Sequence, residues 1–145
     1  MAFQFSTQFR NDLLDTNDLA TLFSGTIKVY AGTVPANADA SIGSATLLCE
    51  YSLNDTGAAL SLDTTAAGGA IGKAPAEVWS GSAVASGTAT FFRYEESGDT
   101  QGAATDERRI QGTVGGAGAD LFVTSTTFTD EQLYTMDYFS ISIPV

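Results

Sequence analysis

The sequence contains no histidine, which removes several kinds of chemistry at once. Without an imidazole there is no Ser-His-Asp or Cys-His mechanism, no general base that titrates near neutral pH, and no zinc site that needs a histidine ligand. The single cysteine, Cys49, has no second thiol with which to form an internal disulfide. It lies in an alternating apolar segment, so we expect a buried thiol rather than a nucleophile. Most templates for hydrolases are excluded in this way.

Basic residues are scarce: six Lys and Arg stand against 17 Asp and Glu, and the formal net charge is −11. This charge repels phosphate, so we expect neither nucleic acid nor a membrane among the partners. Charged residues together make up 16% of the chain, whereas a typical soluble domain has about 25%. A surface with so little charge favours contact with other proteins.

Long apolar runs are also missing. No segment approaches the roughly 20 apolar residues that a membrane-spanning helix needs. The start Met-Ala-Phe-Gln-Phe has neither the basic part nor the long apolar part of a secretory signal. We therefore expect assembly in a reducing cytoplasm.

The main signal that is present is an alternation of apolar and polar residues with a period of two, which is typical of β-strands. The expected strands are residues 26–30, 45–53, 58–62, 78–84, 87–94, 110–114, 121–126 and 139–145. The aromatic segment 87–94 should be a central strand. With 145 residues, the chain is a single domain by size. The pattern predicts an all-β fold: an antiparallel β-sandwich, jelly-roll-like, of about seven or eight strands.

The pattern is helical before the first strand. Ser6 has a side chain that caps helices, and Asn17 or Asp18 has one for a second helical turn. We expect residues 1–23 to form a short helical N-terminal arm beside a sandwich of residues 26–145. Removal of the arm should leave the sandwich folded.

Two segments, residues 33–44 and 63–75, are rich in turn-forming and small residues and lack periodicity. We expect them to be surface loops that contact partners. The glycine clusters at 68–72 and 115–118 lack the Lys-Ser/Thr ending of a phosphate-binding loop, so we interpret them as turns.

Five acids are concentrated in residues 95–107. A pair of carboxylates there would suit glycosidase chemistry, and several together would suit a calcium ion. The segment lacks flanking aromatic residues and the regular spacing of an EF-hand loop, so we interpret it as a loop of solvated acids. We expect no catalytic residue, no metal, no other cofactor and no enzymatic activity. The acids are Glu95, Glu96, Asp99, Asp106 and Glu107.

Aromatic residues make up 10% of the chain and could line a sugar-binding face. Alternation places about half of them toward the core, and the core is the interpretation that we prefer. Tyr30, Tyr134 and Tyr138 are of the type that is enriched in protein interfaces.

Six motifs follow one another along most of the chain after residue 5. They are LFSGTIKVYAGTVP at 22–35, ADA at 38–40, VWSG at 78–81, GTATFFR at 87–93, RIQGTV at 109–114 and FSISIP at 139–144. In this order the chain resembles a small family of structural proteins from the virions of tailed bacteriophages. The resemblance implies a non-enzymatic virion component, and we expect a head decoration (cement) protein.

Such a protein would sit on the outer surface of the virion head as a homodimer or homotrimer and bridge neighbouring subunits of the major capsid protein. The expected partners are therefore the major capsid protein and further copies of this chain. The alternative is a tail or fibre component that adheres to glycans of a host surface through exposed aromatic residues and the acidic loop. The expected capsid or oligomer interface residues are Phe3, Phe5, Phe9, Leu13, Tyr30, Val34, Pro35, Tyr134 and Tyr138.

Overall fold

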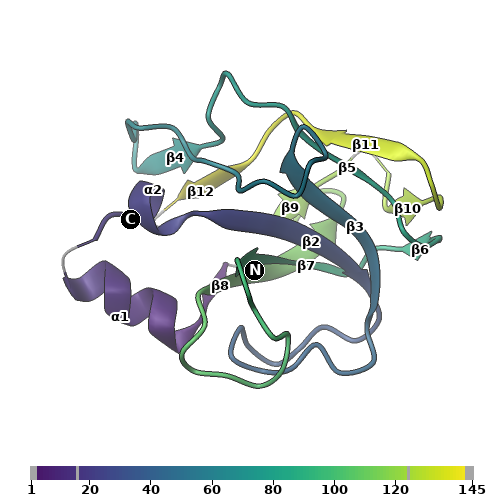
Figure 1. Cartoon of the computed structure of the whole chain (residues 1–145), viewed down its shortest axis with the longest axis horizontal. Helices are drawn as coiled ribbons and strands as arrows, with labels where there is room; N and C mark the ends of the chain where they lie inside the picture. The colour runs from purple at the N-terminus through teal and green to yellow at the C-terminus, as the bar shows by residue number, and fades with distance from the viewer. Residues whose placement is uncertain (1–2, 16, 124, 143–145) are drawn as a thin grey trace.

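A computed structural model describes residues 3–15, 17–123 and 125–142 of the chain (Figure 1). These residues form two short helices and twelve strands. In chain order they are β1 (Gln4–Phe5), α1 (Thr7–Asp15), α2 (Leu19–Leu22), β2 (Gly25–Ala31), β3 (Thr46–Leu53), β4 (Ala70–Gly72), β5 (Trp79–Ser82), β6 (Gly87–Thr88), β7 (Phe91–Glu96), β8 (Arg109–Gly115), β9 (Leu121–Phe122), β10 (Thr127–Phe128), β11 (Leu133–Met136) and β12 (Ser140–Ser142).

Eight of these strands form one large sheet with the order β1-β8-β7-β2-β3-β5-β11, and β9 pairs beside β8. All of its pairs are antiparallel except β8 with β9. Two small antiparallel pairs, β10 with β6 and β12 with β4, complete the strands (Figure 1). The predicted all-β, sandwich-like fold is confirmed. Of the expected last strand, Ile143 to Val145 lie outside the described residues.

The register gives the central strands two different faces. On one face Ile27 of β2 lies between Tyr94 of β7 and Tyr51 of β3. On the other face the next residue, Lys28, lies between Arg93 and Glu50. Because side chains alternate along a strand, one face of the sheet is apolar and the other is polar.

The apolar face carries an aromatic core. Phe23 stacks on Tyr94, with ring centroids 4.2 Å apart, and on Trp79 at 5.9 Å. Phe139 packs on Trp79 at 5.5 Å. These rings are almost completely buried, and such aromatic pairs add stability beyond the apolar area that they remove from water. Residues far apart in the sequence therefore share one core.

The N-terminal segment packs into this core, which differs from the expectation of a separable arm. Phe5 pairs with Ile110 in the β1–β8 ladder, and Phe9 of α1 is completely buried. The predicted caps are confirmed: the Ser6 hydroxyl accepts a hydrogen bond from the Phe9 amide, and the Asp18 carboxylate accepts one from Thr21. The helices form as expected, but their apolar faces pack on the sheet.

Several expected elements differ from the structure; residues 87–94, for example, are divided between the strands β6 and β7. Residues 58–62 make only single-residue bridges, such as Gly25 with Leu60, whereas the expected loop 63–75 contains the short strand β4. In β3, a register shift opposite Val29 and Tyr30 places an extra residue, Leu48, in the strand, where it is buried. A β-bulge of this kind changes the alternation in a way that the periodicity does not reveal.

Two loops meet beside the polar face of the sheet. They are residues 32–45, between β2 and β3, and residues 97–108, between β7 and β8 (Figure 1). The Ile42 amide donates a hydrogen bond to the Gln101 carbonyl, and the Ala104 amide donates one to the Asp39 carbonyl. Together the loops bury the polar face, so the sheet is covered on both sides.

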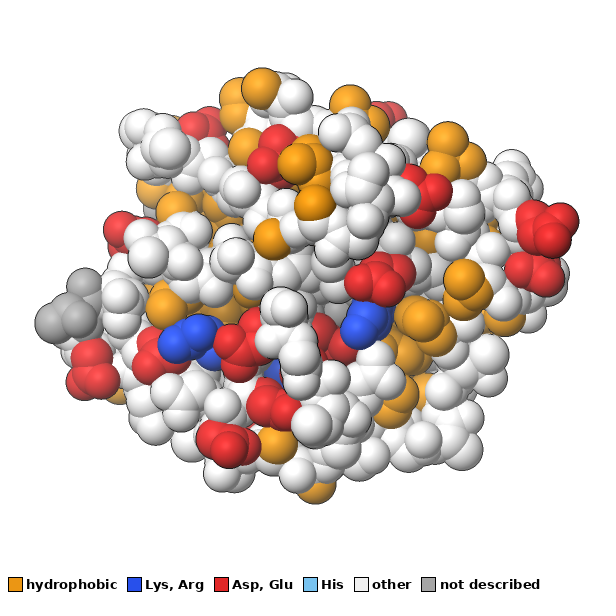
Figure 2. All heavy atoms as spheres, viewed as in Figure 1, with side chains coloured by type: hydrophobic (Ala, Val, Ile, Leu, Met, Phe, Trp, Pro, Cys, Tyr) orange, Lys and Arg blue, Asp and Glu red, His pale blue; other side chains and the backbone are white. Residues whose placement is uncertain are grey.

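Figure 2 shows one face of the molecule, where acidic side chains are scattered and basic ones are few. Neither helix in the described part of the chain is long and apolar enough to cross a membrane.

Candidate functional site

The polar face of the sheet holds a buried cluster of charged side chains. Glu95 of β7 lies opposite Arg109 of β8, and Asp99 reaches the same place from the loop 97–108. The side chains of Glu95 and Asp99 are 0% and 1% exposed. The interpretation of this segment as solvated acids is therefore wrong for these two residues, because buried cations hold them inside the fold.

Arg109 is the centre of the cluster. Its Nε donates to Asp99 Oδ2 at 2.7 Å and its Nη2 to Asp99 Oδ1 at 2.9 Å, which is a bidentate pair. It also forms an ion pair with Glu107 and donates to the Gly102 carbonyl. Burial works against the charged form, but the hydrogen bonds and charge of Asp99 raise the pKa of the guanidinium above its ordinary value. Arg109 therefore stays charged and fixes the loop 97–108.

The Glu95 carboxylate is likewise fully hydrogen-bonded within the cluster. Its carboxylate accepts hydrogen bonds from Lys28 Nζ at 2.7 Å, from the Tyr30 hydroxyl at 3.0 Å and from Gln101 Nε2 at 3.2 Å. Burial and the neighbouring Glu95 charge raise the pKa of the Tyr30 hydroxyl far above its ordinary value, so Tyr30 remains a donor. These contacts explain why a carboxylate is stable at this depth.

Arg93 is the least satisfied member of the cluster. Its Nη2 donates to Gln111, but its Nε and Nη1 are buried without a hydrogen-bond partner. Burial and the nearby Arg109 charge lower the pKa of its guanidinium. Within the described ranges, no three His, Cys, Asp or Glu side chains are placed to hold a metal ion. The arrangement functions as a clamp that holds two loops on the sheet.

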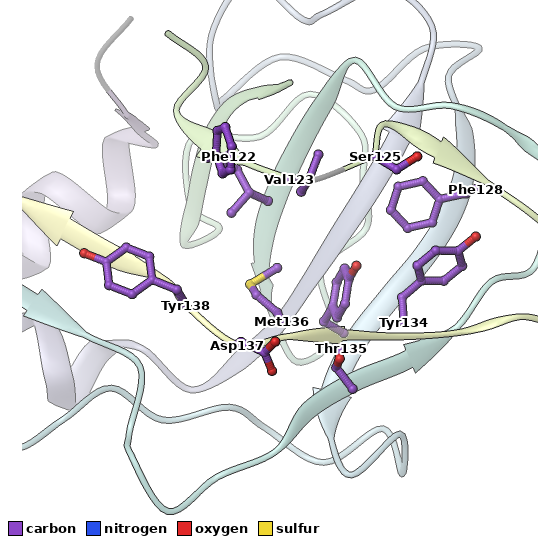
Figure 3. A pocket seen from close by; sticks show the side chains of 11 residues that line it. Phe122, Val123, Ser125, Phe128, Tyr134, Thr135, Met136, Asp137 and Tyr138 are labelled. Atoms are coloured by element: carbon purple, nitrogen blue, oxygen red, sulfur yellow. The ribbon is translucent and has the colours of Figure 1, made fainter. Parts of the chain in front are cut away.

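The second candidate site is an open aromatic pocket of about 270 Å³. Figure 3 shows Phe122, Val123, Ser125 and Phe128 on one side of it, and Tyr134 and Met136 of β11, with Tyr138 just after this strand, on the other. The described residues that line it are Tyr51, Leu121, Phe122, Val123, Ser125, Phe128, Tyr134, Thr135, Met136, Asp137 and Tyr138. We call it the aromatic pocket.

The aromatic pocket has a buried base and an exposed rim. Phe128 and Tyr51 are 2% and 4% exposed, whereas Phe122 and Tyr138 at the rim are 65% and 78% exposed. Two large aromatic side chains so exposed beside one pocket are typical of a binding surface.

Tyr51 adds a polar group to the base of this pocket. Its hydroxyl makes no hydrogen bond to any residue in the described part of the chain, although the side chain is almost completely buried. Burial, with smaller contributions from Cys49 and Tyr134, raises the pKa of this hydroxyl well above its ordinary value. A neutral hydroxyl is thus available to a ligand, as donor or acceptor.

The structure separates the nine expected interface residues into three groups. Phe9 and Tyr30 are completely buried, so their assignment to an interface is wrong: Phe9 packs on Tyr94, and Tyr30 stacks on Phe91. The half-buried ones that pack on the core or on the loops are Phe3, Phe5, Leu13, Pro35 and Tyr134. Val34 and Tyr138 are exposed and remain available to a partner.

Sequence reasoning missed the partners of Tyr134 and Tyr138 in the aromatic pocket. Phe122 and Tyr51 come from distant segments, and only the topology brings them together. The buried charges left a clearer signal, because Arg93 and Glu95 alternate with apolar residues in a strand expected to be central. A charged residue in such a strand needs a buried partner.

Comparisons of this chain with protein-family models, with curated proteins and with solved structures found no match.

Proposed function

We propose that this protein is a non-enzymatic structural protein of a phage virion, a decoration protein that binds the outer surface of the head. In this role it bridges neighbouring subunits of the major capsid protein and stabilises the shell by binding alone. The family resemblance of the sequence motifs suggests the role, and the surface of the structure supports it.

The observation that carries the proposal is a set of exposed apolar side chains on and around the edge strand β11. Four large ones are more than half exposed: Val84 at 60%, Phe122 at 65%, Leu133 at 57% and Tyr138 at 78%. Leu133 lies at the end of β11 that pairs with Ser82, and Val84 lies at the same end because the adjacent Ala83 exchanges backbone hydrogen bonds with residues 131–132. Tyr138 follows the opposite end of β11, and Phe122 is on β9. On a chain with 16% charged residues, such a surface suits a protein that lies against another protein.

The clamped loops fit the same role. A protein that bridges capsid subunits must transmit load without local unfolding, and the loops 32–45 and 97–108 are tied to the sheet by Arg109. Many modest contacts repeated over a shell then add to a strong attachment.

The copy number in virions tests the proposal. Virions of the phage that encodes this chain would be separated into heads and tails, and the chain quantified by mass spectrometry against the major capsid protein. Hundreds of copies that travel with heads are expected. A handful of copies that travel with tails, or absence from virions, would overturn the decoration role.

The aromatic pocket favours a second candidate function, adhesion of a tail or fibre component to host glycans. Exposed aromatic rings such as Phe122 and Tyr138 stack on sugar rings, and the nearby Asp137 has an acceptor for hydroxyl groups. Binding of the purified chain to a glycan array, lost in Tyr138→Ala and kept in Leu14→Ala, would favour this candidate.

A further inference from the structure

The aromatic pocket is surrounded by charge of one sign. Residues 110–145 contain no Lys or Arg but four acids, which are Asp120, Asp130, Glu131 and Asp137. Asp137 lines the pocket, and Asp130 and Glu131 are exposed just before β11. The potential at the pocket is therefore negative, which disfavours anionic ligands and attracts cations.

The walls of the pocket have the chemistry that recognises an organic cation. The face of an aromatic ring carries partial negative charge, so a cation placed over it is attracted electrostatically. Phe122 and Tyr138 at the rim and Phe128 at the base contribute three such rings, and Figure 3 shows them on opposite sides of the opening. An aromatic pocket bordered by acids binds an ammonium or guanidinium group better than it binds an uncharged ligand such as a sugar ring.

The Tyr51 hydroxyl is the second observation that points to a ligand. It is held at the base of the pocket with no hydrogen-bond partner in the described ranges. The hydroxyl oxygen is not among the fully buried atoms that lack a partner in the described residues, so it is accessible from the pocket and can form a hydrogen bond with a ligand. Its oxygen accepts a hydrogen bond from an N–H group, which an ammonium or a guanidinium carries and a quaternary ammonium lacks.

This chain does not itself supply the cation. Five of its six basic side chains are buried or paired within the chain: Lys28, Lys73, Arg93, Arg108 and Arg109. The sixth, Arg10, is exposed and has no carboxylate partner among the described residues. A second copy would also bring the same net charge of −11. The charge therefore favours a different protein over a second copy of this one.

We infer that the aromatic pocket receives a lysine or arginine side chain from an exposed segment of a partner protein. The inference rests on the proposed function, because it names the chemistry by which the major capsid protein would be held. The cation lies over the rings of Phe122 and Tyr138, its N–H group donates to the Tyr51 hydroxyl, and Asp137 balances its charge at the rim.

Nuclear magnetic resonance of the ¹⁵N-labelled full chain tests the inference with three probes. They are Nα-acetyl-lysine methylamide, the same compound acetylated on Nε, and methyl glucoside. The cationic probe is expected to shift amide signals of residues 121–138 and to bind about fivefold or more tightly than its uncharged acetylated form. Raising the salt concentration should weaken this binding.

Matched variants connect the binding to the pocket. Phe122→Ala and Tyr138→Ala remove exposed rings, so the fold should be kept while binding of the cationic probe weakens about threefold or more. Tyr51→Phe tests the hydroxyl alone and should also weaken binding. Leu14→Ala, on an 84% exposed position of α1, is the control and should bind as the original chain does.

Three results would overturn the inference: equal binding of the acetylated probe, shifts of the same amides by methyl glucoside alone, or no shift with any probe. The second of these would support the glycan-binding candidate instead. Copy number in heads is measured separately. A chain abundant on heads that ignores the lysine probe overturns only the inference, whereas a chain absent from heads overturns the proposed function even if the pocket selects lysine.

Discussion

Cys49 shows how position in the sheet controls the chemistry of one side chain. Its thiol is completely buried on β3, and burial raises its pKa to about 12, with smaller contributions from Asp55 and Glu50. Only the thiolate reacts with disulfide reagents. We expect the native chain at pH 8 to react with such a reagent about a hundredfold more slowly than the chain in urea. Reaction at the same rate in both states would contradict the buried placement.

The same pKa gives a pH dependence with a definite sign. The pKa of the thiol is higher in the folded chain than in the unfolded one, so the folded state holds its proton more strongly. The stability that this contributes is complete below the unfolded pKa and is lost as the pH rises toward the folded value of about 12. The free energy of unfolding, measured with urea from pH 8 to 10.5, should therefore fall less in Cys49→Ala than in the original chain.

Phe92 and its neighbour Phe91 are both buried but lie on opposite faces of β7. Phe92 meets Phe139 edge to face at 6.2 Å, on the apolar side, whereas Phe91 stacks on Tyr30 at 5.0 Å. Phe92→Ala should lower the free energy of unfolding by about 3–5 kcal/mol, because it leaves a cavity in the aromatic core. In urea titrations the control Phe122→Ala should change it by less than about 1 kcal/mol. A similarly small effect of Phe92→Ala would contradict the prediction and would show that the surrounding core collapses into the cavity left by the ring.

At the scale of elements, the first question is whether the segment from β1 to α2 is part of the core. It pairs with β8, buries Phe9 and Phe23, and its Leu22 carbonyl accepts a hydrogen bond from the Tyr94 hydroxyl. Deletion of residues 1–23 should therefore leave a chain without native structure. Its circular dichroism spectrum should lose the β-sheet signal. Leu14→Ala, which changes an exposed position of α1, is the control and should keep the native spectrum. A folded truncated chain would restore the expectation of a separable arm.

The loops 32–45 and 97–108 depend on one arginine. Arg109 is completely buried, and it donates to the carbonyls of Ala38 and Gly102, one in each loop. Arg109→Met should lower the free energy of unfolding by about 3–5 kcal/mol, because it leaves the buried Asp99 carboxylate without its cation.

Arg10→Met, at an exposed arginine, is the matched control and should be nearly neutral in urea titrations. The double variant Arg109→Met with Asp99→Asn should recover part of the loss, because it removes the uncompensated charge. If the single variant were as stable as the control, the clamp would be disproved.

The elements also show what periodicity can and cannot predict. The strands β2, β3, β7 and β8 could be predicted because alternating residues such as Ile27 and Val29 must face a core. The strand β4 could not, because Ala70 and Gly72 lie in a glycine-rich stretch and gain their structure only by pairing with β12. The extra residue Leu48 in β3 is likewise set by the neighbouring strand.

At the scale of the whole molecule, the two candidate sites differ in how far the sequence could predict them. The charges of the clamp lie in or next to strands with clear alternation, but their burial depends on loops that fold back over them. The aromatic pocket depends on topology alone, because Tyr51, Phe122 and Tyr138 meet only after three separate segments have folded. Strand order leaves no mark on periodicity, so neither Tyr51 nor Phe122 could be assigned to the pocket in advance.

The shared core has a consequence for how the whole molecule unfolds. Trp79 lies between Phe23, at the end of α2, and Phe139, just before β12, so residues from both ends of the chain pack on one ring system. Loss of either end removes packing from the centre, and one clamp holds both loops. We therefore expect a single cooperative transition on heating or in urea, with coincident midpoints for the fluorescence of Trp79 and for circular dichroism. Two separate midpoints would mean that an end of the chain leaves while the sheet stays folded, and such loosening would argue against the proposed role, in which the chain holds neighbouring capsid subunits together under load.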